Sequence, residues 1–223
     1  MTRTKLIDRK LPNYTFGEEI FNMVSHIVGG GFGVVALVVS VLVSAFKGDA
    51  FGIVGSAIYG ASLISLYAMS SIYHGLREGT AKKVMQVLDH CTIFFLIAGT
   101  YTPMLLTAIR IHSPIWCWGI FGAVWGLAVL GIVLNAIDLK KYATFSMISY
   151  IGMGWCIVLA GKVTIEAIPF GGLMLILAGG IAYTVGAVLY ILGVRLRWMH
   201  SIFHLFVLMG SILQFFGIVF YVL

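Results

Sequence analysis

The sequence predicts an all-α integral membrane protein, a bundle of seven transmembrane helices with the N-terminus in the cytoplasm and the C-terminus outside. Hydrophobic residues make up 61% of the chain and charged residues 10%, whereas apolar residues make up ~45–50% of a soluble domain. Nearly the whole chain divides into apolar runs, each close to the roughly 20 residues that cross a bilayer. The lysines and arginines gather in alternate connections between these runs.

Charged and polar residues mark the ends of the apolar runs. We expect spans at residues 20–46, 51–76, 84–109, 113–137, 142–163, 167–194 and 198–222. The connections are too short to hold an extramembrane domain. We therefore divide the chain into a cytoplasmic N-terminal segment, residues 1–17, and a seven-transmembrane domain, residues 18–223.

The distribution of cations sets the expected orientation. Outer connections hold only Lys47, Arg110 and Lys162 of the 14 lysines and arginines. Cytoplasmic loops are enriched in these residues, and an even number of spans would break the alternation. We therefore expect a multi-pass protein of the cell inner (plasma) membrane. Because the net charge of +6 is scattered among short loops, we expect no nucleic-acid partner.

Four ionisable residues are expected within about two turns of the cytoplasmic surface: His74, Asp89, His200 and His204. Ionisable groups inside a membrane are costly and are functional candidates by default. His200 and His204 are four residues apart, so they share one helix face and can bind one cation. A third nitrogen from His74 would leave a fourth position for water, as in a catalytic zinc site.

Asp89 and Ser70 are the expected catalytic residues beside these ligands. Asp89 could hold the water or accept its proton, and the Ser70 hydroxyl, one turn before His74, can lie above that imidazole. The structural alternative is that the histidines cap carbonyls or meet lipid phosphates at headgroup level. Three histidines and an aspartate from three helices at one depth favour the metal site.

Other polar or unusual residues are expected to play no part in the site. His90 follows Asp89 directly and points about 100° away on the helix. His112 falls in a predicted outer loop, and Pro103 is expected to kink the third helix.

Several segments together resemble the bacterial hemolysin III family: SSIYHGL starting at Ser70, LDHCTIFFLIAGTYTP, GGIAYTVGAVLY and HSIFHLFVLMGS. That family is related to the progestin and adiponectin receptors and, more distantly, to alkaline ceramidases. The resemblance runs from Glu18 to the C-terminus. It implies a seven-helix bundle with an intramembrane zinc site, whose ligands match His74, His200 and His204 and whose water-holding pair matches Asp89 and Ser70.

The segment GEEIFNMVSHIVGGG also resembles a first-helix signature of that family. Its spacing places Glu19, Asn22 and His26 on one helical stripe near the cytoplasmic end. These residues could support the site by orienting ligands, could gate substrate entry, or could pack as a polar cluster. We favour structural support over a ligand role for His26.

The leading functional hypothesis is a zinc-dependent hydrolase that cleaves an amide or ester in a lipid-like substrate, with membrane lipids as its partners. Asp89 would be the general base, and Ser70 would orient Asp89 or stabilise the oxyanion. A membrane-state sensor or receptor with a structural zinc site is the alternative. A pore-forming hemolysin ranks lower, because the chain has no amphipathic segment that could leave one membrane and enter another. An ion transporter is a further possibility, but the outer half of the expected helices lacks the paired charges that would continue an ion pathway. Imidazole suits several metals, and the sequence leaves the substrate and the oligomeric state open.

Overall fold

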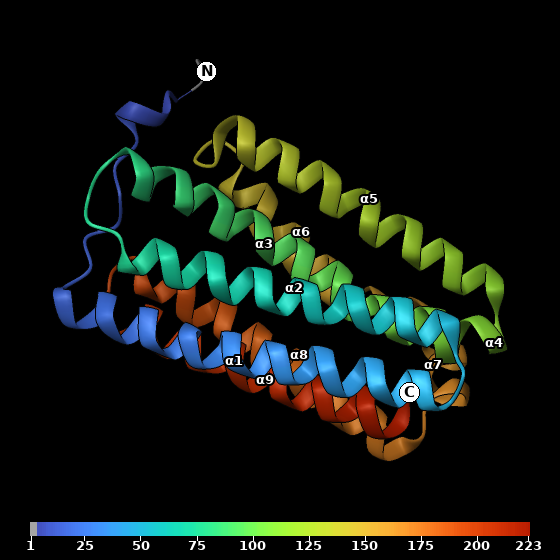
Figure 1. Ribbon diagram of the computed structural model, residues 1–223. Helices are drawn as coiled ribbons and strands as arrows, with labels where there is room; N and C mark the ends of the chain where they lie inside the picture. The colour runs from blue at the N-terminus through green and yellow to red at the C-terminus, as the bar shows by residue number, and fades with distance from the viewer. Residues whose placement is uncertain (1–3) are drawn as a thin grey trace.

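The computed structural model describes residues 4–223 as a bundle of helices that lie side by side (Figure 1). Within these residues, seven helical segments are long and apolar enough to cross a membrane. The seven-helix fold is therefore confirmed, and the chain is a multi-pass membrane protein. The short helix η1 (Leu6–Asp8) and the C-terminus lie toward opposite ends of the bundle in Figure 1. Which end faces the cytoplasm stays a prediction.

The spans differ in regularity. Five are single α-helices: α1 (Phe16–Phe46), α2 (Ala50–Gly75), α5 (Pro114–Asp138), α8 (Phe170–Gly193) and α9 (Met199–Tyr221). The third span consists of α3 (Thr80–Met104), the π-helical η2 (Leu105–Ile109) and α4 (Arg110–His112). The fifth consists of α6 (Ala143–Trp155), the 3₁₀-helical η3 (Cys156–Ala160) and α7 (Gly161–Ala167), and a short η1 (Leu6–Asp8) precedes the bundle.

Three helix ends extend four residues further than the sequence predicts. The first helix begins at Phe16 instead of residue 20, because Thr15 and Glu18 form a capping box in which each side chain accepts from the other residue's backbone N–H. The third begins at Thr80 instead of residue 84, since the charge of Lys82 finds partners inside the protein. The fifth continues to Ala167 instead of residue 163. Charges mark the ends of apolar windows, and helices can run past them.

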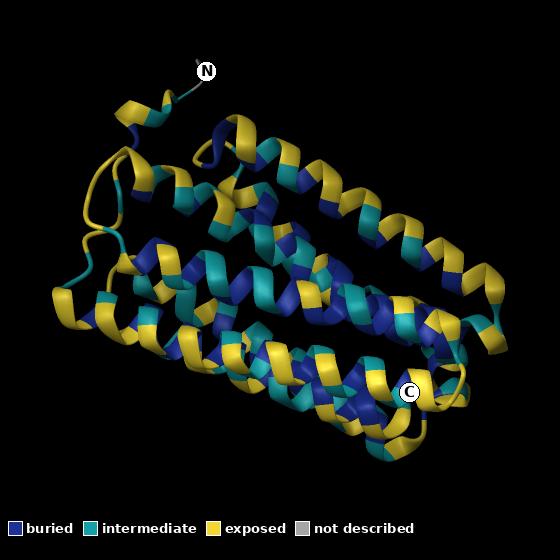
Figure 2. Ribbon diagram, in the orientation of Figure 1, coloured by how far each residue is buried: buried dark blue, intermediate teal, exposed yellow. Residues whose placement is uncertain are grey.

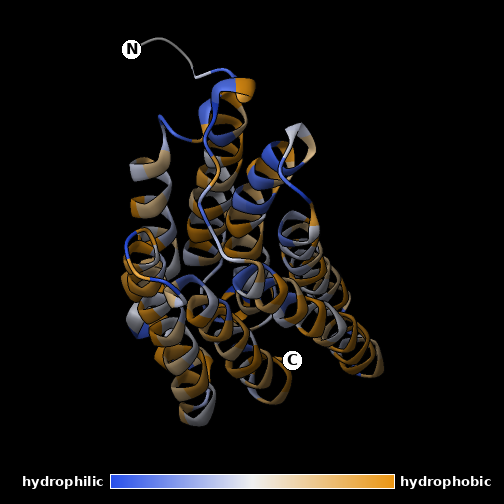
Figure 3. Cartoon of the chain, turned by 90° about the vertical axis from the view of Figure 1, so that its left-hand side faces the viewer, coloured by the Kyte–Doolittle hydropathy of each residue, from blue (hydrophilic) through white to orange (hydrophobic). Residues whose placement is uncertain are grey.

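The bundle buries many polar residues together with its hydrophobic core. Helix α1 buries Asn22, Ser40 and Ser44 and exposes Val35 and Val38, and Figure 2 shows buried and exposed turns alternating along α1 and α5. This pattern suits a hydrocarbon solvent, because apolar side chains gain no free energy by leaving lipid for the protein interior. Small residues at the contacts let the helices approach closely. Hydrophilic residues gather in the N-terminal segment and the connections (Figure 3).

Helix α3 packs against α2 and α5, and most of its apolar stretch is buried. Pro103 lies inside it, and the backbone passes from α- to π-helix at Leu105. Proline lacks the N–H that would continue the α-helical ladder, and a π segment is one way to accommodate the irregularity. The structure thus places a change of helix type just after the residue where the sequence predicts a kink.

Helix α9 is held against α2 by a shared hydroxyl. The Tyr67 hydroxyl on α2 donates to Ser211 Oγ at 2.7 Å, and the Tyr183 hydroxyl on α8 lies 2.8 Å from the same oxygen. All three side chains are buried or part-buried. These contacts set the position of α9 relative to α2, the two helices that carry the candidate metal ligands.

Gly60 on α2 offers a test of the close packing between α1 and α2. A Cβ added at Gly60 would lie 2.6 Å from Leu37 Cα, and backbone cannot yield as a flexible side chain can. We expect Gly60→Ala to destabilise the folded protein by about 1–3 kcal/mol through overpacking, measured as a lower Tm of the purified protein in detergent.

Gly31→Ala is the matched control for this test, because Gly31 is exposed on α1 and a Cβ there meets nothing within 4 Å. Alanine also has the higher helix propensity, so this variant should keep or slightly raise the Tm. An equal Tm for Gly60→Ala and Gly31→Ala would contradict the predicted close approach.

Candidate metal centre

Three histidines converge near the end of the bundle that carries the N-terminus. His74 on α2 and His200 and His204 on α9 each offer a ring nitrogen, and these nitrogens all lie within 4.8 Å of one another. All three residues are buried. No other group of three histidine, cysteine or acidic residues in the described chain meets this criterion. The three histidines could therefore hold a metal ion.

One pair of these nitrogens is spaced nearly as two ligands of one ion would be. The Nε2 atoms of His200 and His204 are 3.1 Å apart. Two nitrogens bound tetrahedrally to zinc at ~2.0–2.1 Å lie about 3.3–3.4 Å apart. The Nε2 atom of His74 is buried without a hydrogen-bond partner, a state that normally requires an explanation. A cation coordinated by that nitrogen would satisfy it, so the donor set fits a metal.

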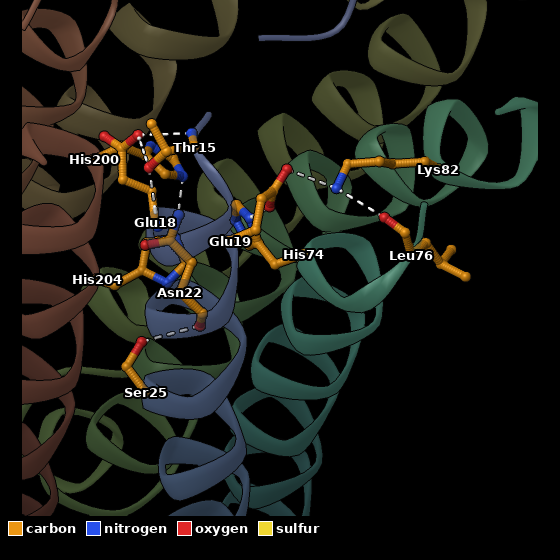
Figure 4. A network of polar contacts seen from close by, with 10 residues as sticks. All are labelled: Thr15, Glu18, Glu19, Asn22, Ser25, His74, Leu76, Lys82, His200 and His204. Atoms are coloured by element: carbon orange, nitrogen blue, oxygen red, sulfur yellow. Dashed lines mark hydrogen bonds and ion pairs between the residues drawn. The ribbon is translucent and has the colours of Figure 1, made fainter. Parts of the chain in front are cut away.

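Glu19 sets the orientation of His74, as Figure 4 shows. His74 Nδ1 lies 2.6 Å from Glu19 Oε2, and Lys82 Nζ donates to Glu19 Oε1 at 2.7 Å and to the Leu76 carbonyl at 3.0 Å. With Nδ1–H donating to the carboxylate, Nε2 keeps its lone pair for a metal. A carboxylate behind a ligating histidine is the usual arrangement in metal sites.

Glu18 positions the start of α9. Its Oε1 accepts from the backbone N–H of Trp198 at 2.6 Å, and its Oε2 accepts from the Thr15 backbone N–H at 2.8 Å. Trp198 is the N-cap of α9 and has a left-handed φ of 65°. Two successive glutamates of α1 thus reach both ligand-bearing helices. The capping box around Glu18 is visible in the sequence, but its contact with Trp198 is not.

Asn22 and His26, which the sequence places on a stripe with Glu19, lie beside α9. The His26 ring stacks on His204 with centroids 3.8 Å apart and meets the Tyr67 ring edge-on at 5.0 Å. Figure 4 shows Asn22 next to His204, with neither side-chain atom hydrogen-bonded. His26 is not in the group of three nitrogens.

Tyr14 is a site residue for which the sequence carries no signal. Its ring stacks on His200 with centroids 4.8 Å apart and lies 5.7 Å from His74. It precedes α1 and so covers the histidines from the N-terminal segment. Burial raises the pKa of the Tyr14 phenol, so the ring stays neutral.

A cavity of about 820 Å³ adjoins the histidines, at the upper end of the roughly 300–1,000 Å³ of small-molecule sites. Apolar residues of α3, α6 and α8 form most of its wall, among them Ile93, Ile97, Met147, Ile151 and Leu177. Ser70, Asp89, His200 and His204 also line it. The space extends from Arg9 and Lys140 at one end of the bundle to Ile168 near the other.

Asp89 and Ser70 share this cavity without bonding to the histidines. Within the described chain, no hydrogen bond joins either side chain to His74, His200 or His204. Asp89 Oδ2 lies 3.6 Å from His90 Nδ1.

Two further histidines, His90 and His112, are outside the group of three. His90 Nδ1 donates to the Gln86 carbonyl at 2.8 Å and Nε2 accepts from the Tyr190 hydroxyl at 3.1 Å. His112 ends α4 and is exposed.

The chain is similar to proteins of one family along nearly its whole length. The family model described as haemolysin-III related matches residues 14–215. "Hemolysin-3" of Bacillus cereus is 38% identical over 206 residues, 92% of each chain. The "Hemolysin-3 homolog" of Bacillus subtilis (strain 168) is 35% identical, covering 93% of this chain and 96% of that protein.

The similarity extends to animal proteins. The human "Monocyte to macrophage differentiation factor" is 26% identical over 194 residues, 82% of this chain and 76% of that protein. The match to the family model covers all seven spans apart from the last turns of α9. Together with the two Bacillus relatives, it shows that this chain belongs to the haemolysin-III-related family.

Proposed function

We propose that this protein is a zinc-dependent hydrolase of the inner membrane that cleaves an amide or ester bond in a lipid-like substrate. One observation carries the proposal: His200 and His204, two of the three clustered histidines, line a large apolar cavity that is also lined by Asp89 and Ser70. A site that only cross-linked helices would have no need of such a cavity. Family membership supports a membrane protein of this type without naming its reaction.

His74, His200 and His204 would hold the ion, and three protein ligands leave the open position that catalytic zinc sites have. When bound, Zn²⁺ would polarise a carbonyl as a Lewis acid and make water acidic enough to react near neutral pH. The Glu19 carboxylate keeps the proton of His74 on Nδ1. The lipid chain would occupy the cavity between α3, α6 and α8, whose apolar lining excludes bulk water.

Asp89 and Ser70 would carry the proton chemistry. The Asp89 carboxylate would accept a proton from the attacking water and return it to the leaving amine or alkoxide. The Ser70 hydroxyl would donate a hydrogen bond to the oxyanion that forms on the substrate carbonyl. Both side chains line the cavity that His200 and His204 also line.

A membrane-state sensor with a structural zinc site is the second candidate. The observation in its favour is that the histidines belong to α2 and α9, with Glu19 and Lys82 linking α1 and α3 to the same point. An ion bound there would cross-link α2 and α9 and so stabilise the bundle. A pore-forming hemolysin has no such observation behind it, although the bacterial relatives carry that name.

Metal content tests the ligand set. We expect the purified protein to hold about one zinc ion per chain and the double variant His200→Ala, His204→Ala to hold almost none, because two of three ligands are removed. Elemental analysis measures this, with His112→Ala as a control at an exposed histidine. Retention of zinc by the double variant would refute this ligand set.

Glu19→Gln tests the carboxylate behind His74. Loss of the carboxylate charge should weaken zinc binding by about 10–100-fold, because a neutral amide accepts from His74 Nδ1–H less strongly and leaves Lys82 without its anionic partner. Competition with a chelator measures the affinity, on protein that still elutes as a single species in gel filtration. Glu166→Gln, at an exposed glutamate of α7, should bind zinc as the wild type does.

Asp89→Asn distinguishes a catalytic zinc site from a structural one. We expect turnover to fall by about 10²–10⁴-fold while zinc content and Tm stay near those of the wild type. The assay incubates the protein with ester- and amide-linked lipids, with and without chelator, and detects released fatty acid by mass spectrometry. Zinc binding without turnover of any lipid, combined with a lower Tm on loss of His200, would favour the sensor instead.

A further inference from the structure

The strongest unexplained feature outside the histidine site is Arg9, in the segment before α1. It is 7% exposed, and its Nε and Nη1 atoms are buried without a hydrogen-bond partner. Burial lowers the pKa of the Arg9 guanidinium, and Asp138 only partly opposes this effect. A buried guanidinium is costly unless an anion satisfies its donors.

No carboxylate of the described chain takes that place. Asp138 is nearby, but its Oδ2 accepts from the Thr4 backbone N–H at 2.7 Å and its Oδ1 from that of Lys141 at 3.1 Å. The ion pairs found among residues 4–223 involve Glu19 and Asp89 and leave Arg9 aside. The unused donors of Arg9 therefore suit an anion that comes from outside the chain.

Arg9 and Lys10 line two spaces at once. One is the apolar cavity beside the histidines, where Lys140 joins them. The other is a pocket of about 490 Å³ that Gly79, Thr80, Lys83 and a single acid, Glu78, also line. Lysines and arginines therefore outnumber acidic residues in the lining of both the cavity and the pocket.

The second pocket contains the start of α3. Gly79 is the N-cap of this helix and no side chain caps it, so backbone N–H groups of the first turn are left for a ligand. The N-terminus of a long helix carries a partial positive charge and favours phosphate. Both Arg9 and the helix terminus thus select the same kind of group.

We propose that Arg9 and Lys10 bind the phosphate of an anionic phospholipid whose acyl chain enters the apolar cavity. Free phosphate has the same headgroup chemistry, but the continuity of the cationic residues with an 820 Å³ apolar space favours a lipid. The inference rests on the proposed function insofar as it names the substrate class, while binding itself requires no turnover. If the N-terminus is cytoplasmic, the site faces the leaflet that carries anionic lipids.

Lipid binding by the purified full chain in detergent tests the proposal. Dioleoylphosphatidylglycerol is compared with dioleoylglycerol, which has the same chains and no phosphate, in titrations followed by native mass spectrometry. We expect the wild type to prefer the phospholipid by at least about tenfold, and Arg9→Gln to lose about that factor, as for one charge-assisted contact. Lys162→Gln removes a cation at an exposed position of α7 and should leave the preference unchanged.

Lys10→Gln provides the same test should Arg9→Gln fail to fold, because Lys10 is exposed and its loss should reduce the preference a few-fold. Equal binding of the two lipids by the wild type, or an unchanged preference in both variants, would overturn the proposal. Binding of inorganic phosphate, with no preference between the two lipids, would overturn the lipid assignment. Asp89→Asn should keep the preference, so failed hydrolysis and failed lipid recognition give different results.

Discussion

The site depends on the contacts of the Glu19 carboxylate, which binds His74 and Lys82 at the same time. It joins α1 to α2 and α3, because a charge near hydrocarbon must find partners inside the bundle. Each partner of Glu19 uses a different oxygen, so both are satisfied without competition. Glu18 does the same toward α9 through the Trp198 backbone. Two adjacent residues of α1 therefore organise the ends of three other helices.

Around these polar contacts the helices pack in the way expected of a protein surrounded by lipid. In water, burial of apolar side chains would drive the helices together. In lipid this drive is absent, and the helices here also meet through glycines and through buried serine and tyrosine hydroxyls, while many valines and isoleucines are exposed. The pair α8 and α9 is bonded to α2 through Ser211. An apolar cavity remains between this pair and the side formed by α3 and α6. The histidines lie where its wall meets the polar contacts, so that metal-binding nitrogens and a space for a hydrocarbon chain adjoin each other.

Much of the fold could be predicted, since each span must satisfy its backbone internally and display about 20 apolar residues. The helix ends were less predictable. Lys82 reads as a loop cation, but it lies in the first turn of α3 because Glu19 neutralises it. The spacing of His200 and His204 already predicts a shared face. The role expected of Asp89 stays a prediction, as its carboxylate shares the cavity and touches His90 instead of the three histidines.

The sequence by itself determined the class of protein, the number of spans and the candidate ligands, because hydrophobic length and helical spacing are local properties. Only the tertiary structure decided that His74 meets α9, that Tyr14 covers His200 and that Arg9 is buried with free donors. These facts depend on how helices far apart in the sequence are rotated and translated against one another. Their relative placement arises from interhelical hydrogen bonds and close contacts, which no single segment encodes.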